Sequence, residues 1–175
     1  DRIKILQKIN FISPYIELPK KLTVKQNLIV FGKLYKIKNL NDRIDYLTSK
    51  LRLSDILNRI TGELSSGQKN RASLAKSLIN DPKVLLLDEP TASLDPEIGD
   101  FIRSFLEDYK KEKKISILLA SHNMNEVTRL CKSILMMKDG IIVDSGSPAS
   151  LIEKHGRKNL EEVFLKLSRR PNEHN

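Results

Sequence analysis

The chain of 175 residues has one cysteine, no tryptophan and no long apolar run. Cys131 alone cannot form an internal disulfide, and no Cys/His cluster has the spacing of a zinc site. No run approaches the ~20 apolar residues of a membrane-spanning helix, and no secretory signal is visible. These absences exclude a secreted disulfide scaffold and an integral membrane protein. They predict a globular protein in a reducing, cytoplasmic setting.

Glycine is also scarce, with seven residues in the chain. None lies in a G-x-x-x-x-G-K-[ST] or G-x-G-x-x-G pattern, so the sequence holds no complete loop for cradling phosphates. The first residue is Asp1, and the chain enters the apolar-polar residues 3–12 directly. We therefore expect the sequence to start within a fold, with a segment missing upstream.

The positive charge is unevenly distributed along the chain. Of the net +9, residues 1–62 carry +8, from 13 Lys and Arg against 5 Asp and Glu. A basic surface can face nucleic acid, an anionic membrane or an acidic protein, although a general preference for Lys, with 21 Lys against 10 Arg, would give the same excess. Nine aromatic residues, not interleaved with the basic ones, offer little surface for stacking bases. We predict no nucleic-acid partner.

The amino-terminal third begins with apolar-polar residues and then becomes helical. Alternation of Ile with polar residues predicts short strands within residues 3–12. Thr23 and Gln26 have the T-x-x-Q spacing of a capping box, and apolar residues then recur at helical spacing. We predict a helix over 24–36.

Two further helices are predicted after this one. Asn41 can cap the first, and Ser54 can cap a short second helix that ends before Gly62. Residues 20–62 are therefore predicted to form a small all-helical unit.

Beyond Gly62 the pattern alternates between helices and strands. Ser65 and Gln68 form another capping box, and their helix should stop before Pro82. The apolar runs 84–87 and 115–120 are typical of strands buried on both faces of a parallel sheet.

Asp95, followed by a proline, can cap the helix between these two strands. Shorter elements follow: a helix near 125–130, strands over 134–137 and 141–143, and closing helices that start at Ser147 and Asn159. The alternation predicts an α/β fold with a parallel sheet.

Three ionisable residues follow the two apolar strands. Asp88 and Glu89 come after the first, and His122 comes after the second. The carboxyl ends of parallel strands form the edge where ligands bind, and two carboxylates there suit Mg²⁺ and a water to be activated. Acidic residues after a strand also cap turns, and a lone histidine is commonly structural. Both interpretations remain open on these residues alone.

The stretch at 64–68 places hydroxyls, a glycine and unpaired amides at a helix N-terminus. Such an end attracts phosphate. Ordinary helix capping explains the same residues, so this motif alone does not decide between the two.

Four motifs together resemble the ATP-binding subunits of ABC transporters. They are L-S-S-G-Q at 64–68, V-L-L-L-D-E-P at 84–90, A-S-L-D at 92–95 and S-H at 121–122. The resemblance covers nearly the whole chain, and its closing stretch is similar to export-type subunits. It implies an α/β fold: a parallel-sheet core like that of P-loop NTPases, incomplete here, with an inserted small all-helical subdomain.

The resemblance assigns Ser65, Ser66, Gly67 and Gln68 to the signature sequence, which reaches across a head-to-tail dimer to the γ-phosphate held by the other subunit. Ser66 replaces the first of the family's two signature glycines.

The remaining site residues follow from the same resemblance. Asp88 would hold Mg²⁺ and Glu89 would activate the attacking water. Asp95 would belong to the loop that couples the two sites, and His122 would contact the γ-phosphate. ATP and Mg²⁺ are the implied cofactors, and in-line attack on the γ-phosphoryl group is the implied reaction.

Two further departures from the family pattern concern the nucleotide. The phosphate-binding loop with its lysine is absent from the sequence. Where the family has a glutamine after the early strand, this chain has Pro14 with Ser13 beside it.

The resemblance divides the chain into four parts: early strands and the glutamine-loop region (1–19), the helical subdomain (20–62), the signature helix and α/β ATPase core (63–147), and C-terminal helices and tail (148–175). Its implied partners are transmembrane permease subunits and a second ATP-binding subunit, at the cytoplasmic face of the membrane. The basic residues would then serve the membrane side. Two alternatives are a non-catalytic partner that lends its signature helix, and a soluble ABC-type ATPase acting on nucleic acid or ribosomes.

Overall fold

The computed structural model describes residues 2–92 and 94–168. The chain divides into two compact units, Asp1–Ala120 and Ser121–Asn175. Each unit is described by itself.

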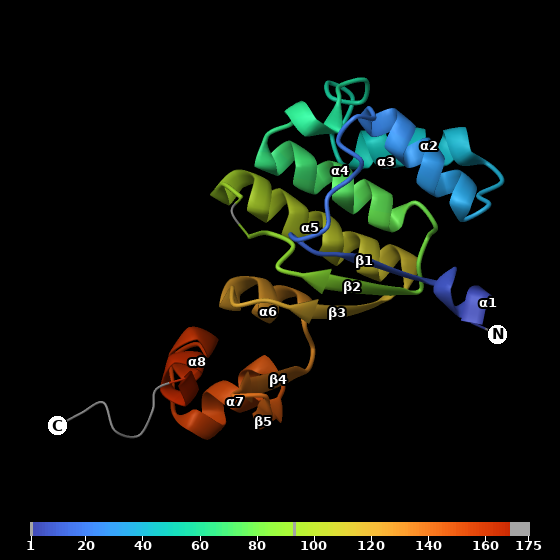
Figure 1. The fold of residues 1–175 in the computed structure, drawn as a ribbon. Coiled ribbons are helices and arrows are strands. Elements are labelled where there is room, and N and C mark those ends of the chain that lie inside the picture. Colours follow the sequence, from blue (N-terminus) through green and yellow to red (C-terminus); the bar gives the residue numbers. More distant parts are fainter. Residues whose placement is uncertain (1, 93, 169–175) are drawn as a thin grey trace. The chain divides into compact units, whose positions relative to one another are not determined.

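The first unit is built on a three-stranded parallel sheet (Figure 1). Its order is β1 (Ile9–Ile12), β2 (Val84–Asp88) and β3 (Ser116–Ala120). Two helices, α4 (Ser66–Leu78) and α5 (Pro96–Lys113), lie on the same side of this sheet. The predicted α/β architecture with a parallel sheet is confirmed.

One face of the sheet carries the core of the first unit. Ile12, Leu85 and Leu87 share one face by the register and are buried. On the other face the register aligns one apolar residue from each strand, and we call Phe11, Leu86 and Leu118 the outer row. Phe11 and Leu118 are exposed.

The prediction that both apolar runs are buried on both faces is wrong. In β2 buried residues alternate with half-buried ones, and in β3 exposed residues alternate with half-buried ones. The helices of the first unit explain this, because α4 and α5 both cover the same face. An apolar run indicates that a strand can be buried on both faces, but the position of the helices decides which face is actually covered.

The strands predicted in residues 3–12 are only half confirmed. β1 covers the second part, but Arg2–Leu6 forms a helix, α1. β1 pairs with β2 from the first residue of β2, Val84, which faces Ile9. The bonding to β2 begins at the Lys8 carbonyl, which accepts the Val84 amide at 3.1 Å, and a helix satisfies the backbone hydrogen bonds of the residues before it locally.

The predicted helical subdomain, residues 20–62, has two α-helices instead of three, and we call it the helical arm. They are α2 (Val24–Leu34) and α3 (Leu40–Lys50), which pack with each other and with α4. Asn39 occupies the N-cap of α3, so the predicted cap at Asn41 is wrong. The predicted helix after Ser54 is also absent, because the chain makes isolated turns there, such as the hydrogen bond from the Ile56 amide to the Leu53 carbonyl.

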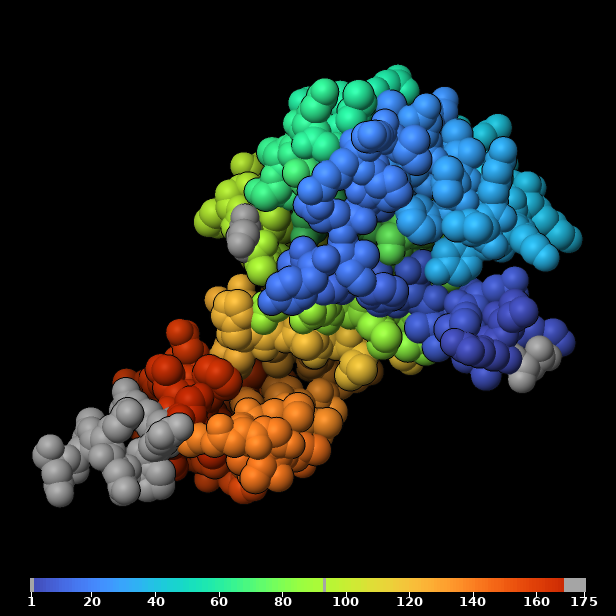
Figure 2. All heavy atoms as spheres, viewed as in Figure 1, coloured from blue at the N-terminus to red at the C-terminus, as the bar shows by residue number. Residues whose placement is uncertain are grey.

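The arm is closed by contacts between its two ends. Thr23 and Ile60 form an antiparallel bridge, and the Gly62 amide donates to the Lys20 carbonyl at 3.0 Å. In Figure 2, blue atoms from the start of this segment lie beside blue-green atoms from its end. A 3₁₀ turn, η1 (Thr61–Glu63), then leads into α4.

The predicted helix caps at Thr23, Ser65 and Asp95 are confirmed. Thr23 with Gln26 forms a capping box at α2, and Ser65 with Gln68 forms one at α4. The Asp95 carboxylate accepts the Ile98 amide at 2.9 Å, and Pro96 is the first residue of α5. These caps fix where α2, α4 and α5 begin.

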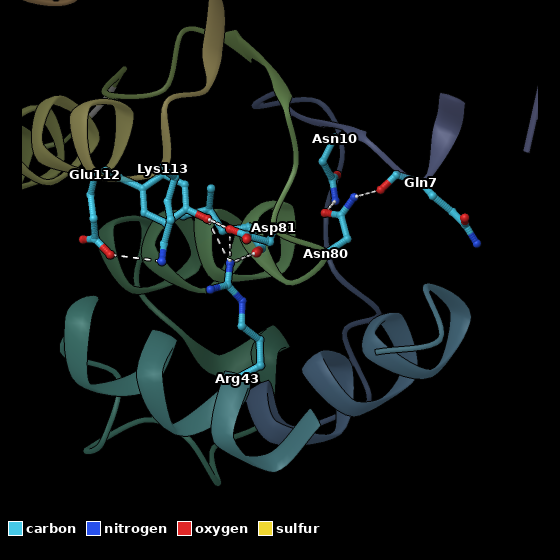
Figure 3. A network of polar contacts seen from close by, with 9 residues as sticks. Gln7, Asn10, Arg43, Asn80, Asp81, Glu112 and Lys113 are labelled. Atoms are coloured by element: carbon cyan, nitrogen blue, oxygen red, sulfur yellow. Dashed lines mark hydrogen bonds and ion pairs between the residues drawn. The ribbon is translucent and has the colours of Figure 1, made fainter. Parts of the chain in front are cut away.

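A polar network around the buried Tyr109 joins α3, the end of α4 and α5 (Figure 3). The Arg43 guanidinium donates to the Tyr109 hydroxyl at 2.9 Å and to the Leu78 carbonyl. The Tyr109 hydroxyl donates to Asp81 Oδ1 at 2.8 Å. Burial raises the pKa of Tyr109 above its ordinary value, so its hydroxyl stays protonated and keeps this donor role. The network ties the helical arm to the core.

The second unit is a β-hairpin packed with helices. Its strands are β4 (Ile134–Lys138) and β5 (Ile141–Gly146), which pair antiparallel. The turn between them uses Asp139 and Gly140, both with positive φ, as expected for a tight hairpin. Its helices are α6 (Met124–Leu130), α7 (Pro148–His155) and α8 (Leu160–Ser168).

An ionic cluster fastens α7 to β5. The buried Asp144 accepts a hydrogen bond from Lys154 Nζ at 2.7 Å, and its second oxygen lies 2.6 Å from His155 Nε2. The hydrogen bond from Lys154, followed by that from His155, holds the pKa of Asp144 well below its ordinary value of 3.8.

We predict that Tyr109→Phe lowers the free energy of unfolding by about 1–2 kcal/mol, because Arg43 and Asp81 lose a buried partner. Urea denaturation followed by circular dichroism measures this. Tyr15→Phe is the matched control, since Tyr15 is 88% exposed. Equal effects of the two substitutions would contradict a special role for the network.

A pH prediction follows from the lowered pKa of Asp144. The stabilisation by its ionised form is complete above the unfolded pKa, about 3.9, and is lost as the pH falls through the lower folded pKa. The stability gap between the wild type and Asp144→Asn should therefore shrink as the pH drops below about 4. Thermal unfolding from pH 6 to 2.5 measures it, and a constant gap would contradict the prediction.

Candidate functional site

The register of the parallel sheet places a serine beside the candidate metal residue. Ile12 pairs with Leu87, so Ser13 follows β1 at the level where Asp88 ends β2. The Ser13 hydroxyl donates to Asp88 Oδ2 at 3.0 Å, and both residues are half-buried. Ser13 entered the sequence analysis only as the neighbour of Pro14, and its contact with Asp88 depends on a strand pairing that sequence does not reveal.

Glu89 adopts a backbone conformation that is unusual for a glutamate. Its φ is 47°, in the left-handed region. Two hydrogen bonds hold it there: its amide donates to the Ala120 carbonyl at 2.8 Å, and its carbonyl accepts the Ala92 amide at 3.1 Å. The turn therefore keeps the carboxylate next to Asp88 at the end of the sheet, at some cost in backbone strain.

The signature residues form the first turn of α4. The Ser65 hydroxyl accepts the Gln68 amide at 3.4 Å, and Gln68 Oε1 accepts the Ser65 amide at 3.1 Å. The amides of Ser66 and Gly67 lie in the same turn, where the helix itself supplies no acceptor. This end of the helix can therefore offer donors to an anion.

Gly67 is not required by the packing of the chain. A Cβ built at this position would lie 3.8 Å from the nearest atom, in Ile98, which is an ordinary van der Waals distance. Ser66, the residue that replaces a glycine of the family pattern, is exposed.

Asn70 connects the signature helix to the end of β2. Its Nδ2 donates to the Pro90 carbonyl at 2.7 Å, while its buried Oδ1 has no partner among the described residues. Sequence reasoning missed this contact, because a polar residue inside a helix gives no indication of the loop that it will meet.

The loop after β1, the start of α4 and the end of β2 enclose one cavity of about 230 Å³. Its lining combines apolar side chains with a polar and charged group. That polar group includes Ser13, Ser66, Asn70, Asp88 and Glu89. The structure thus brings together part of the predicted signature and both predicted carboxylates.

The other two predicted residues lie elsewhere. Asp95 caps α5 and is exposed. His122 belongs to the second unit, where it is also exposed.

The donor set at the end of β2 fits Mg²⁺. Within residues 2–92 and 94–168, no group of three His, Cys, Asp or Glu side chains could hold a metal. Mg²⁺ does not need such a cage, because it is usually held by one or two carboxylates together with nucleotide phosphates and water. Asp88 and Glu89 supply oxygen ligands of this kind.

Comparison with known proteins decides the family. A family model described as ABC transporter matches residues 1–92, which include the signature stretch and the D-E-P turn. The chain belongs to the ABC transporter family.

Curated relatives agree with this assignment. The ABC transporter ATP-binding protein NatA of Bacillus subtilis is 35% identical over 83% of this chain and 59% of its own length. Nod factor export ATP-binding protein I of Rhizobium sp. is 35% identical over 90% of this chain and 52% of its own length. The chain thus spans between half and two thirds of these relatives.

Solved structures show the same fold. The ATP-binding subunit of an ABC transporter superposes with a TM-score of 0.81 at 22% identity, over 96% of this chain and 71% of the other. An ATP-binding cassette in a dimeric post-hydrolysis state, bound to ADP and Pi, gives 0.74 at 23% identity, over 84% and 67%. Among the described residues, no helix is long and apolar enough to cross a membrane.

The conformation of Glu89 yields a stability prediction. Glycine adopts positive φ without the Cβ clash of other residues, so Glu89→Gly should be more stable than Glu89→Ala by about 1 kcal/mol. Chemical denaturation of the two variants measures the difference. The same pair of substitutions at Glu97, which lies in the first turn of α5, should have the opposite order. An alanine variant at position 89 as stable as the glycine variant would contradict backbone strain there.

Proposed function

We propose that this chain is part of an ATP-hydrolysing subunit of an ABC transporter, which binds and hydrolyses ATP at a dimer interface to move a substrate across a membrane. The observation that supports this most is the placement of Asp88 and Glu89, at the carboxyl end of a central parallel strand and beside the signature helix. The family assignment supports the same activity.

In this proposal the two carboxylates have different tasks. Asp88 holds Mg²⁺, which neutralises charge on the nucleotide phosphates. Glu89 accepts a proton from the attacking water, and its turn keeps the carboxylate in position before the reaction. Catalysis then rests mostly on positioning and electrostatics, because phosphoryl transfer needs little covalent chemistry from the protein.

The signature residues act on the nucleotide of a second subunit. Ser65 and Gln68 are used within the capping box, which leaves the amides of Ser66 and Gly67 as donors to the γ-phosphate across a head-to-tail dimer. The space around Gly67 supports this role, because the fold itself would accept a side chain there.

Asp95 and His122 are each proposed to have a further role. Asp95 belongs to the loop that couples the two ATP sites, and as the N-cap of α5 it has a fixed backbone position. His122, directly after β3, contacts the γ-phosphate.

The proposed partners are transmembrane permease subunits and a second ATP-binding subunit. One curated relative is named for the export of Nod factor and another for methionine import, so these names do not fix a direction of transport. The net +8 of residues 1–62 supports a position at the cytoplasmic face of the membrane, near acidic segments or anionic lipid.

Replacing the proposed base tests the proposal. In the intact subunit Glu89→Gln should lower the ATPase rate by at least about 100-fold, because the amide cannot accept the proton from water. A phosphate-release assay measures the rate, and a fluorescent ATP analogue should show that nucleotide still binds.

Glu97→Gln is the matched control, since it removes the same charge from the first turn of α5. It should hydrolyse ATP at the wild-type rate. A Glu89→Gln variant that keeps the wild-type rate would contradict the catalytic role and favour a non-catalytic subunit that lends its signature helix.

A further inference from the structure

The loop after β1 presents one polar side chain to the proposed metal residue. The Ser13 hydroxyl is a single donor, and it points at Asp88 Oδ2, 3.0 Å away. The Tyr15 amide lies 3.4 Å from the same hydroxyl oxygen and donates to it. Because the Ser13 hydroxyl oxygen accepts the Tyr15 amide on one side, the hydroxyl proton is directed toward Asp88 on the other.

Pro14 helps to hold this geometry. A residue that precedes proline is confined to extended backbone, so Ser13 continues the direction of β1 past the last paired residue, Ile12. Ser13 therefore lies one residue beyond the last β1–β2 pair, at the level of Asp88. Pro14 itself has no polar side chain and cannot replace the hydroxyl.

We propose that Ser13 is a positioning residue, which orients the Asp88 carboxylate so that its other oxygen is available to Mg²⁺. Within residues 2–92 and 94–168, Ser13 is the hydrogen-bond partner of the Asp88 side chain, and Oδ1 accepts no bond. Hydrogen bonds to ligating carboxylates commonly fix their orientation. The inference rests on the proposed ATPase function and names a residue that this function had not used.

The test measures metal affinity directly. Mn²⁺ is the probe, and its binding to the intact subunit in the presence of ADP is followed by electron paramagnetic resonance. Ser13→Ala should weaken Mn²⁺ binding by about 10-fold, in the range seen when partners of metal ligands are removed. Ser13→Thr keeps a hydroxyl at the same place and should bind Mn²⁺ within about threefold of the wild type.

A matched control excludes a general effect on the cavity. Ser73→Ala makes the same change in a serine that lines the same cavity but does not contact Asp88. It should bind Mn²⁺ as the wild type does. The free energy of unfolding of each variant is measured in parallel. If Ser13 were merely structural, Ser13→Ala would lower this free energy, and Ser13→Thr would not restore the affinity for Mn²⁺.

The outcomes separate this inference from the proposed function. Wild-type Mn²⁺ affinity in Ser13→Ala, or an equal loss in Ser73→Ala, would overturn the role of Ser13, while the loss of activity in Glu89→Gln would still support the ATPase. A wild-type subunit that neither binds Mn²⁺ with ADP nor hydrolyses ATP would overturn both.

Discussion

The parallel pairing of β1 with β2 is the constraint on which the rest of the site depends. A shift by one residue would move every side chain of β1 to the other face and separate Ser13 from Asp88. A chain of hydrogen bonds from the buried Asn10 helps to hold β1 at its other end: Asn10 donates to Asn80 at 2.9 Å, and Asn80 donates to the Gln7 carbonyl at 2.9 Å (Figure 3). The register is therefore held by polar contacts at both ends of β1.

The signature helix is anchored along its length and open at its beginning. Lys76 of α4 is buried, and its ammonium lies over the rings of Phe11 in β1 and Phe31 in α2, at 5.2 and 5.4 Å. Burial lowers the pKa of Lys76. Asn70 and Arg43 add contacts to the end of β2 and to α3. With the rest of the helix so restrained, its first turn is a rigid platform for the donors of Ser66 and Gly67.

Local patterns predicted local structure well. The capping boxes at Thr23 and Ser65, and the cap at Asp95, were predicted because each involves residues three apart in sequence. The sequence also predicted where Asp88 and Glu89 lie, because the end of an apolar strand marks an edge of the sheet, while their roles in a site stay predictions.

Features set by distant contacts could not be predicted in this way. Residues 3–6 alternate like a strand, yet they form a helix, because their pairing depends on where β2 begins. Ser54 has the chemistry of a helix cap, but the segment after it forms turns around the buried Leu53 and Ile56. The contacts of Ser13 and Asn70 span 75 and 20 residues. Their partners are chosen by tertiary packing, which short-range spacing does not record.

Because there is open space beside Gly67, selection for stability and selection for ligand binding would favour different residues at this position. Alanine favours a helix more than glycine does, and nothing in the fold opposes a methyl group at this position. Selection for stability alone would therefore replace the glycine, whereas the proposed contact of its amide with a nucleotide would retain it. On the proposed function, position 67 would change early in descendants that had stopped using ATP, while the buried contacts of Lys76 and Tyr109 persisted.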